Sequence, residues 1–214
     1  MGDSISTYEG YNPPGYVIYY RDDVLYENEI DSVNDTWWKQ VIDGLGGELC
    51  VNNSYSGSLV SGIYDPSACS AVRCSALHGE QVPDVILIYI GSNDRGNSID
   101  IGLDAPQDIK TFYGAYRTML KQLKANYPKA KIVCGTLLIG KLKDFNDPPN
   151  DRFIKETSRY NDAIKLAVEE EGCLLADLAL NCERYETLDY CHPTKNGHEL
   201  MARLWLKCLN SINL

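Results

Sequence analysis

Four short polar segments of the chain contain the residue types that acyl transfer requires. Residues 2–6 (GDSIS) include a serine, residues 189–193 (DYCHP) include an aspartate and a histidine, and residues 55–57 (YSG) and 91–94 (GSND) supply a glycine and an asparagine. A serine hydroxyl is a poor nucleophile unless a histidine accepts its proton and a carboxylate holds that histidine in one tautomer. These segments therefore predict a site for nucleophilic attack on a carbonyl carbon.

The spacing suggests a role for each of five residues. Ser4 is the expected nucleophile, and Asp189 and His192 are close enough along one turn for the carboxylate to meet an imidazole nitrogen. The tetrahedral intermediate also requires fixed hydrogen-bond donors for its oxyanion. Asn93 offers a side-chain amide, Gly57 allows a backbone N–H to approach closely, and Ser4 adds its own N–H. The chain thus contains every group that a serine hydrolase site needs.

Each of these signals is weak when it is taken alone. A serine in a Gly-Asp-Ser sequence is more often a turn or capping residue, and a lone Asp-x-x-His is often a helix cap or a surface pair. Gly57 and Asn93 also have ordinary turn and loop interpretations. The four segments together, in this order and at the ends of predicted strands, favour the catalytic interpretation.

The rest of the sequence alternates predicted strands and helices. Four short apolar runs have the continuous hydrophobic character of strands that are covered on both faces: residues 48–52, 84–90, 130–136 and 173–176. Five amphipathic stretches are predicted helices: residues 36–45, 66–77, 108–126, 152–171 and 194–210. The alternation predicts an α/β fold with a parallel sheet between helices, in which ligands bind at the carboxyl ends of the strands.

With these segments in place, the sequence resembles the GDSL/SGNH hydrolase superfamily, the GDSL-like lipases and acylhydrolases, from residue 2 to about residue 205. The resemblance implies that Ser4 is the nucleophile, that His192 is the base and that Asp189 orients it. It also implies an oxyanion hole made by the Ser4 amide, Gly57 and Asn93. The implied fold is the three-layer α/β/α, flavodoxin-like parallel sheet, and the implied activity is ester hydrolysis without a metal or other cofactor.

The chain departs from the family pattern in two places. Ser92 stands where threonine is common, which is a mild change. Family members run an apolar first strand directly into the Gly-Asp-Ser motif, whereas here only Met1 precedes Gly2. We therefore expect the first strand to be missing or truncated and the natural chain to start upstream. We further expect residues outside this numbering, or a strand of another chain, to fill its place, or the sheet to close up with Ser4 displaced.

Length and composition predict one domain, residues 1–214, without nucleic-acid or membrane-spanning function. The formal net charge is −10, from 20 Lys and Arg against 30 Asp and Glu, and this gives no electrostatic support for binding a phosphate backbone. No apolar run approaches the roughly 20 residues that cross a bilayer. No signal peptide is visible either, so the chain as given is expected to be cytoplasmic. Secretion stays an alternative, because we expect the natural chain to start upstream of Met1.

The eight cysteines are expected to be reduced thiols. Cys50, Cys134 and Cys173 lie in apolar segments, where cysteine behaves as a small hydrophobic residue. Cys69 and Cys74 lack the spacing of a zinc site and fall on a predicted helix, where side chains five apart point in different directions. We therefore predict neither a disulfide nor a metal site.

Other residues leave alternatives open. Eight of the 21 aromatic residues fall between Tyr8 and Trp38, and they can form either a packed loop or an aromatic wall for an acyl chain or a sugar ring. Arg73 can pair with an acid behind the site or serve a structural role. His198, on the last predicted helix, is interpreted as a surface or packing residue.

The prediction that best accounts for these observations is a carboxylic ester hydrolase that forms an acyl-enzyme on Ser4. Its substrate is a small-molecule or carbohydrate ester, and an acetylated sugar, a short acyl ester, a lysophospholipid and a thioester all fit. One alternative is a non-catalytic carbohydrate-binding module with an impaired triad. Another is a redox or acyl-transfer protein that uses Cys191, which stands beside His192. The sequence assigns no oligomeric state.

Overall fold

The structure is a computed structural model of the chain and describes residues 1–21, 29–143 and 150–214. Tyr26, one of the aromatic residues between Tyr8 and Trp38, therefore lies outside the described residues.

Three strands form the central parallel sheet, in the order β1 (Val85–Ile88), β2 (Lys131–Gly135) and β4 (Leu174–Ala176). All three were predicted from their apolar runs. Cys134 of β2 is buried and pairs with Ile88 on one side and Leu175 on the other. The sheet is parallel throughout, so the carboxyl ends of its strands lie at one edge, as the sequence predicted.

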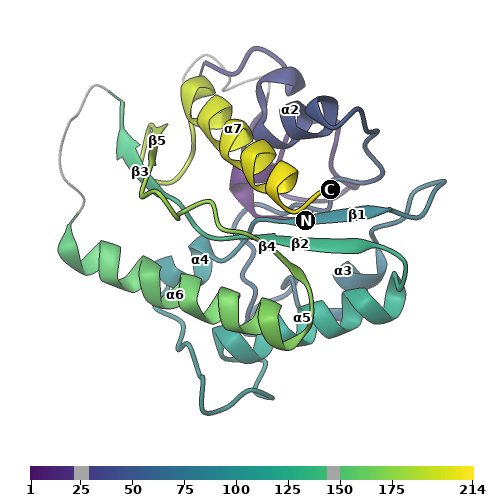
Figure 1. Cartoon of the computed structure of the whole chain (residues 1–214), viewed down its shortest axis with the longest axis vertical. Helices are drawn as coiled ribbons and strands as arrows, with labels where there is room; N and C mark the ends of the chain where they lie inside the picture. The colour runs from purple at the N-terminus through teal and green to yellow at the C-terminus, as the bar shows by residue number, and fades with distance from the viewer. Residues whose placement is uncertain (22–28, 144–149) are drawn as a thin grey trace.

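Helices cover both faces of this sheet, as Figure 1 shows. On one face lie α5 (Phe112–Asn126) and α6 (Asp151–Glu170), and on the other lie α2 (Trp37–Gly44) and α7 (Lys195–Ser211). Side chains cap three of these helices at their N-termini: Thr111 caps α5, Asn150 caps α6 and Thr194 caps α7. The predicted three-layer α/β/α architecture is confirmed.

A second, two-stranded parallel sheet was not predicted. It pairs β3 (Ile139–Leu142) with β5 (Arg184–Thr187), and β5 leads into the segment that carries Asp189 and His192. Both strands are short and mix polar with apolar residues, so neither has a periodicity that identifies it. The remaining short elements are η1 (Ser4–Ser6), η2 (Val33–Asp35), α3 (Ala71–Ser75) and α4 (Ser92–Gly96).

The helix predicted over residues 66–77 is wrong in its first half. The helix there is α3, which begins at Ala71 because the Ser70 hydroxyl caps it by accepting the Arg73 N–H. Ahead of the cap, the backbone N–H groups of Ala68 and Cys69 bond to carbonyls of residues 59 and 60. These tertiary contacts replace the intrahelical bonds that the sequence pattern favoured.

No full first strand precedes η1 in the described chain, and the strand predicted over residues 48–52 is not formed. Gly2 instead makes isolated parallel bridges to Ser54 on one side and Tyr89 on the other. The Met1 amino group donates to the Leu87 carbonyl at 2.8 Å. Within the described ranges, residues 48–52 pair with no strand, and the nearest bridge to the sheet is made by Ser54.

Next to Met1, a groove of about 1000 Å³ lies between residues 49–52 and β1. Its walls include apolar side chains of Leu49, Val51, Val85 and Leu87. The lining also includes charged side chains, among them Glu48, Asp84 and Lys131, and Met1 lies against the groove. Ser4, Asp189 and His192 do not line it.

No helix within the described ranges combines the length and the apolar character that crossing a membrane requires.

Candidate active site

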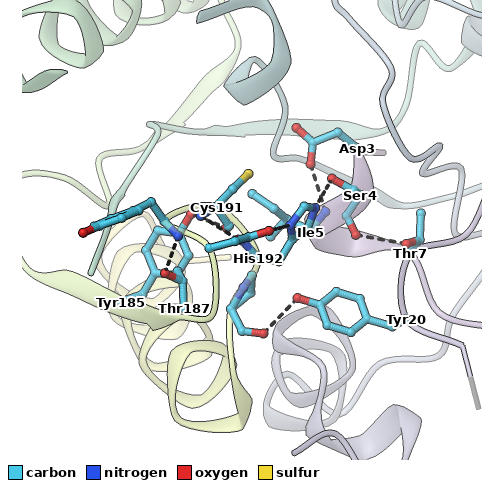
Figure 2. Close-up of polar contacts among 12 residues, drawn as sticks. Asp3, Ser4, Ile5, Thr7, Tyr20, Tyr185, Thr187, Cys191 and His192 are labelled. Carbon is cyan, nitrogen blue, oxygen red and sulfur yellow. Dashed lines mark hydrogen bonds and ion pairs between the residues drawn. The ribbon is translucent and has the colours of Figure 1, made fainter. Parts of the chain in front are cut away.

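Ser4, His192 and Asp189 form a continuous chain of hydrogen bonds. Ser4 Oγ lies 2.9 Å from His192 Nε2, and His192 Nδ1 lies 2.6 Å from Asp189 Oδ2. Figure 2 shows the Ser4 hydroxyl directed at the His192 ring. The structure thus brings together the three residues that the sequence singled out, although Ser4 and His192 are 188 positions apart.

Local hydrogen bonds place Ser4 at the start of a short helical turn. Asp3 caps η1 by accepting the Ile5 N–H on Oδ1 at 3.1 Å, and the Thr7 hydroxyl donates to the Ser4 carbonyl at 2.9 Å (Figure 2). Ser4 is only 4% exposed. Its main chain is therefore held on both sides, and the hydroxyl has little freedom to move away from His192.

The turn that carries Asp189 and His192 is shaped by the Asp189 carboxylate itself. Its Oδ1 accepts the backbone N–H groups of Cys191 at 3.0 Å and His192 at 2.7 Å, which leaves Oδ2 for the imidazole. Partial burial alone would raise the pKa of Asp189, but hydrogen bonds from the His192 ring and from these backbone groups outweigh it and lower the pKa below its usual value. An ionised carboxylate only accepts, so His192 Nδ1 carries the proton and Nε2 can accept from Ser4.

Asn93 and Gly57 lie on two adjoining segments, one helical and one a loop. Asn93 is in the first turn of α4, and its Nδ2 donates to the main-chain carbonyl of Ser58 at 3.0 Å. Gly57, directly before Ser58, is exposed and has φ +78°, a conformation that favours glycine. The Tyr55 N–H donates to the Gly2 carbonyl at 3.2 Å, so this loop is also bonded to the segment that carries Ser4.

Arg73 lies behind this loop and is completely buried. Its Nη2 donates to the carbonyls of Gly2 at 3.0 Å and Asn53 at 2.9 Å, its Nε donates to Asn53 Oδ1 at 3.0 Å, and its Nη1 donates to Ser58 Oγ. None of the ion pairs among the described residues involves Arg73. Of the two roles that the sequence left open, pairing with an acid is therefore not the one observed. Burial lowers the pKa of this guanidinium. Arg73 thus joins the Ser4 segment to the Gly57 loop.

Two further carboxyl groups shape the site. Asp94 accepts the N–H groups of Val60 and Ser61 at 2.8 and 2.9 Å. Asp3 is buried, and its Oδ2 has no hydrogen-bond partner among the described residues. Burial raises the pKa of Asp3 to about 6, against the opposing effects of the Ile5 N–H and of His192. Asp3 is therefore a further titratable group close to the reacting atoms, besides His192 and Asp189.

The aromatic residues near the N-terminus divide between the two roles that the sequence left open. Trp37, Trp38 and Tyr20 are buried, as a packed loop would require. The ring of Tyr19 instead stacks on the imidazole of His192, with the centroids 3.5 Å apart and the planes 7° apart. No signal in the sequence distinguishes Tyr19 from its neighbours, because its position depends on contact with a segment at the other end of the chain.

The remaining histidine and cysteine residues of interest have other environments. His198 is fully buried and accepts the Trp37 N–H on Nδ1 at 3.1 Å, which is the packing role that the sequence suggested and not a surface one. All eight cysteines are free thiols. Burial raises the pKa of Cys191 to about 12, which disfavours the thiolate that a cysteine nucleophile needs. Within the described residues, no group of three or more His, Cys, Asp or Glu could hold a metal ion.

Comparison with known proteins identifies a family for most of the chain. A family model described as GDSL-like Lipase/Acylhydrolase matches residues 1–161, which include Ser4, Gly57 and Asn93 but end before Asp189 and His192. A search of curated proteins found no match.

Several solved structures have the same fold. A Bacteroides ovatus protein, provisionally described as a GDSL-like lipase, is 23% identical with a TM-score of 0.76, and the match covers 98% of this chain and 95% of that chain. A Bacteroides uniformis protein with the same description is 26% identical, with a TM-score of 0.72 and coverage of 99% and 92%. An acetyl xylan esterase from Geobacillus stearothermophilus is 20% identical, with a TM-score of 0.62 and coverage of 97% and 91%.

Proposed function

Because the chain belongs to the GDSL-like lipase/acylhydrolase family, we propose that it hydrolyses carboxylic esters through an acyl-enzyme on Ser4. One observation carries the proposal: Ser4 Oγ, the His192 ring and Asp189 Oδ2 form an unbroken hydrogen-bonded chain, with contacts of 2.9 and 2.6 Å. This is the arrangement in which a serine is activated by a base that a carboxylate holds in one tautomer.

In the first half-reaction, Ser4 Oγ attacks the ester carbonyl while His192 Nε2 takes its proton. A bond forms between Oγ and the carbonyl carbon, and the carbonyl oxygen becomes an oxyanion. The oxyanion then collapses, the bond to the alcohol oxygen breaks, and His192 returns its proton to the departing alcohol. Asp189 stays ionised throughout and stabilises the imidazolium.

In the second half-reaction, water replaces the alcohol. His192 Nε2 takes a proton from the water as its oxygen attacks the acyl carbon, and the second tetrahedral intermediate collapses by breaking the bond to Ser4 Oγ. His192 returns the proton to that oxygen, and the carboxylic acid leaves. In both halves the proposed oxyanion donors are the N–H groups of Ser4 and Gly57 and Nδ2 of Asn93. No cofactor takes part in this scheme.

The first test is whether Ser4 carries the reaction. The wild-type chain should hydrolyse p-nitrophenyl acetate and take up one equivalent of a fluorophosphonate, which peptide mass spectrometry should locate on Ser4. Ser4→Ala should abolish both signals, whereas Ser6→Ala, two residues further along η1, should keep the label. A wild-type chain that neither turns over nor labels would instead favour the carbohydrate-binding module. Labelling of Cys191 by a thiol reagent with loss of activity would favour the cysteine mechanism.

The substrate class is a separate proposal. The fold is shared with an acetyl xylan esterase, and this supports testing acetylated sugars first. Acetylated xylo-oligosaccharides should be compared with p-nitrophenyl esters of increasing acyl length, a lysophospholipid and an acyl thioester, with kcat/KM as the readout. A preference for acetyl over longer acyl groups supports carbohydrate deacetylation, and a preference for long acyl chains contradicts it.

A further inference from the structure

The face of the His192 imidazole is covered by Tyr19, with ring centroids 3.5 Å apart and an interplanar angle of 7°. The segment that carries Tyr19 is tied to both sides of His192. The Tyr19 N–H donates to Thr7 Oγ1 at 2.9 Å, and the Thr7 hydroxyl donates onward to the Ser4 carbonyl at 2.9 Å. On the other side, the Tyr20 hydroxyl donates to the Pro193 carbonyl at 2.9 Å. The stack is therefore built into the site.

Besides the Tyr19 stack, two hydrogen bonds from described residues hold the imidazole, and the proposed reaction removes one of them. Ser4 bonds to His192 Nε2 only while its oxygen carries a hydrogen. In the acyl-enzyme that oxygen belongs to an ester and has no hydrogen to donate. The remaining bond is to Asp189, whose side chain is 46% exposed on the turn. With only this hydrogen bond left, the ring is freer to turn about its Cα–Cβ and Cβ–Cγ bonds, and Nε2 then moves away from the position where it meets the water.

We propose that Tyr19 is a positioning residue for the second half-reaction. The inference rests on the proposed acyl-enzyme mechanism and goes beyond it by assigning a role to a residue outside the four short polar segments. A flat ring stacked on the imidazole blocks the rotation that the acyl-enzyme would otherwise allow. It thereby keeps Nε2 where it can accept a proton from the entering water, and its effect is largest after Ser4 has been acylated.

The stack itself can be observed by proton NMR. The chain has three histidines, so the His192 ring protons can be assigned by their loss in His192→Gln. The ring current of Tyr19 should move these protons upfield. Tyr19→Leu should remove the shift and Tyr19→Phe should keep it, because phenylalanine retains the ring. His192 protons that do not move in Tyr19→Leu would overturn the stacking on which the inference depends.

The role in deacylation is tested by stopped-flow kinetics with p-nitrophenyl acetate. In Tyr19→Leu, the rate of the acylation burst should stay within about twofold of wild type, and the deacylation rate should fall about tenfold, the scale of a modest loss of positioning. Steady-state kcat and KM should then fall together, with kcat/KM nearly unchanged. Tyr19→Phe should restore deacylation. Tyr11→Leu is the matched control, because Tyr11 lies on the same segment but packs on Tyr8 and Trp38.

The outcomes separate this inference from the proposed function. A wild-type chain that forms no acyl-enzyme overturns both. If the wild type acylates Ser4 and the Tyr19→Leu variant deacylates at the normal rate, only the role of Tyr19 is overturned. Equal losses in acylation and deacylation, or failure of Tyr19→Phe to rescue, also overturn it, because they indicate general damage to the site.

Discussion

The side-chain amide of Asn93 donates from Nδ2 to the main-chain carbonyl of Ser58, 3.0 Å away and 35 positions earlier in the sequence. Ser58 directly follows Gly57, and its hydroxyl accepts from the buried guanidinium of Arg73. This hydrogen bond uses one of the two N–H groups of the Asn93 amide and thereby fixes the orientation of the amide. The second N–H is the one that the proposed mechanism directs at the oxyanion.

Asn93→Ala should therefore lower kcat on the order of 10²–10³-fold, the usual loss for one oxyanion donor, with a much smaller change in KM. Steady-state kinetics with p-nitrophenyl acetate measures this. Asn210→Ala, at an exposed position near the end of α7, is the control and should have wild-type kinetics. Full activity in Asn93→Ala would show that this amide is not an oxyanion donor.

Ser4 and His192 should behave as one unit in kinetics. We expect Ser4→Ala and His192→Ala each to lower kcat on the order of 10⁴–10⁶-fold, because a serine without its base, or a base without its serine, does not form the acyl-enzyme. The double variant should be no slower than either single variant. Additive losses, measured with enzyme free of wild-type contamination, would contradict the hydrogen-bonded relay as the reacting unit.

Asp3→Asn should change how stability depends on pH. The pKa of Asp3 rises from 3.8 to about 6 on burial, so between these values the folded state binds more protons than the unfolded state. The free energy of unfolding of wild type should therefore fall as pH rises from about 4 to 6, relative to Asp3→Asn, by on the order of 3 kcal/mol, and change little above pH 6.

Urea unfolding of both proteins between pH 4 and 7.5 measures this difference. Asp104→Asn removes an exposed carboxyl and is the control for the loss of one charge. A constant difference between wild type and Asp3→Asn over this range would mean that Asp3 is ionised in the folded protein at pH 4 and above.

Adding a five-residue segment ahead of Met1, with apolar residues at alternate positions, should raise the melting temperature of the protein. The added residues would lie in the groove beside Val51 and Leu87, and each buried aliphatic side chain contributes roughly 1.5–3 kcal/mol. For a domain of this size each kcal/mol corresponds to roughly 2–4 °C, so we expect a gain of at least about 5 °C. An extension of equal length with proline and aspartate at alternate positions is the control, because it cannot join a ladder.

The gain should also depend on pH. Burial, reinforced by the positive charge of Arg73, lowers the pKa of the Met1 amine from 8.0 to about 5. The unfolded 214-residue chain then binds more protons than the folded one between these values, so its stability should rise with pH across this range. An extension turns the amine into an amide, and its advantage should shrink from pH 6 to pH 8.5. Equal melting temperatures for the two extended forms would show that the groove does not accept a strand.

Much of the fold follows from patterns that each segment carries by itself. The apolar runs that became β1 and β2 need burial on both faces wherever they lie, and the amphipathic stretches of α5, α6 and α7 each have one face that must pack on a sheet. The residue types of the site can also be recognised from the sequence alone, because few combinations of side chains other than histidine with aspartate activate a serine hydroxyl.

Every feature that the sequence did not reveal depends on contacts between distant segments. Residues 48–52 have the composition of a strand but form no ladder with any other described segment, and a strand exists only when a neighbour supplies hydrogen bonds. The first half of the helix predicted over residues 66–77 was lost to backbone bonds with residues 59 and 60. The pairing of β3 with β5 joins two segments too short and polar to identify themselves.

The sequence by itself therefore determined the layer architecture and the chemical identity of the candidate site, because hydrophobic periodicity and side-chain chemistry are local properties. Only the tertiary structure decided that Ser4 meets His192 at 2.9 Å, that Arg73 bonds to carbonyls and side-chain oxygens, and that Tyr19 stacks on the imidazole. Each of these contacts joins residues that lie far apart in the chain. Their distances are set by the packing of whole elements, which no single segment encodes.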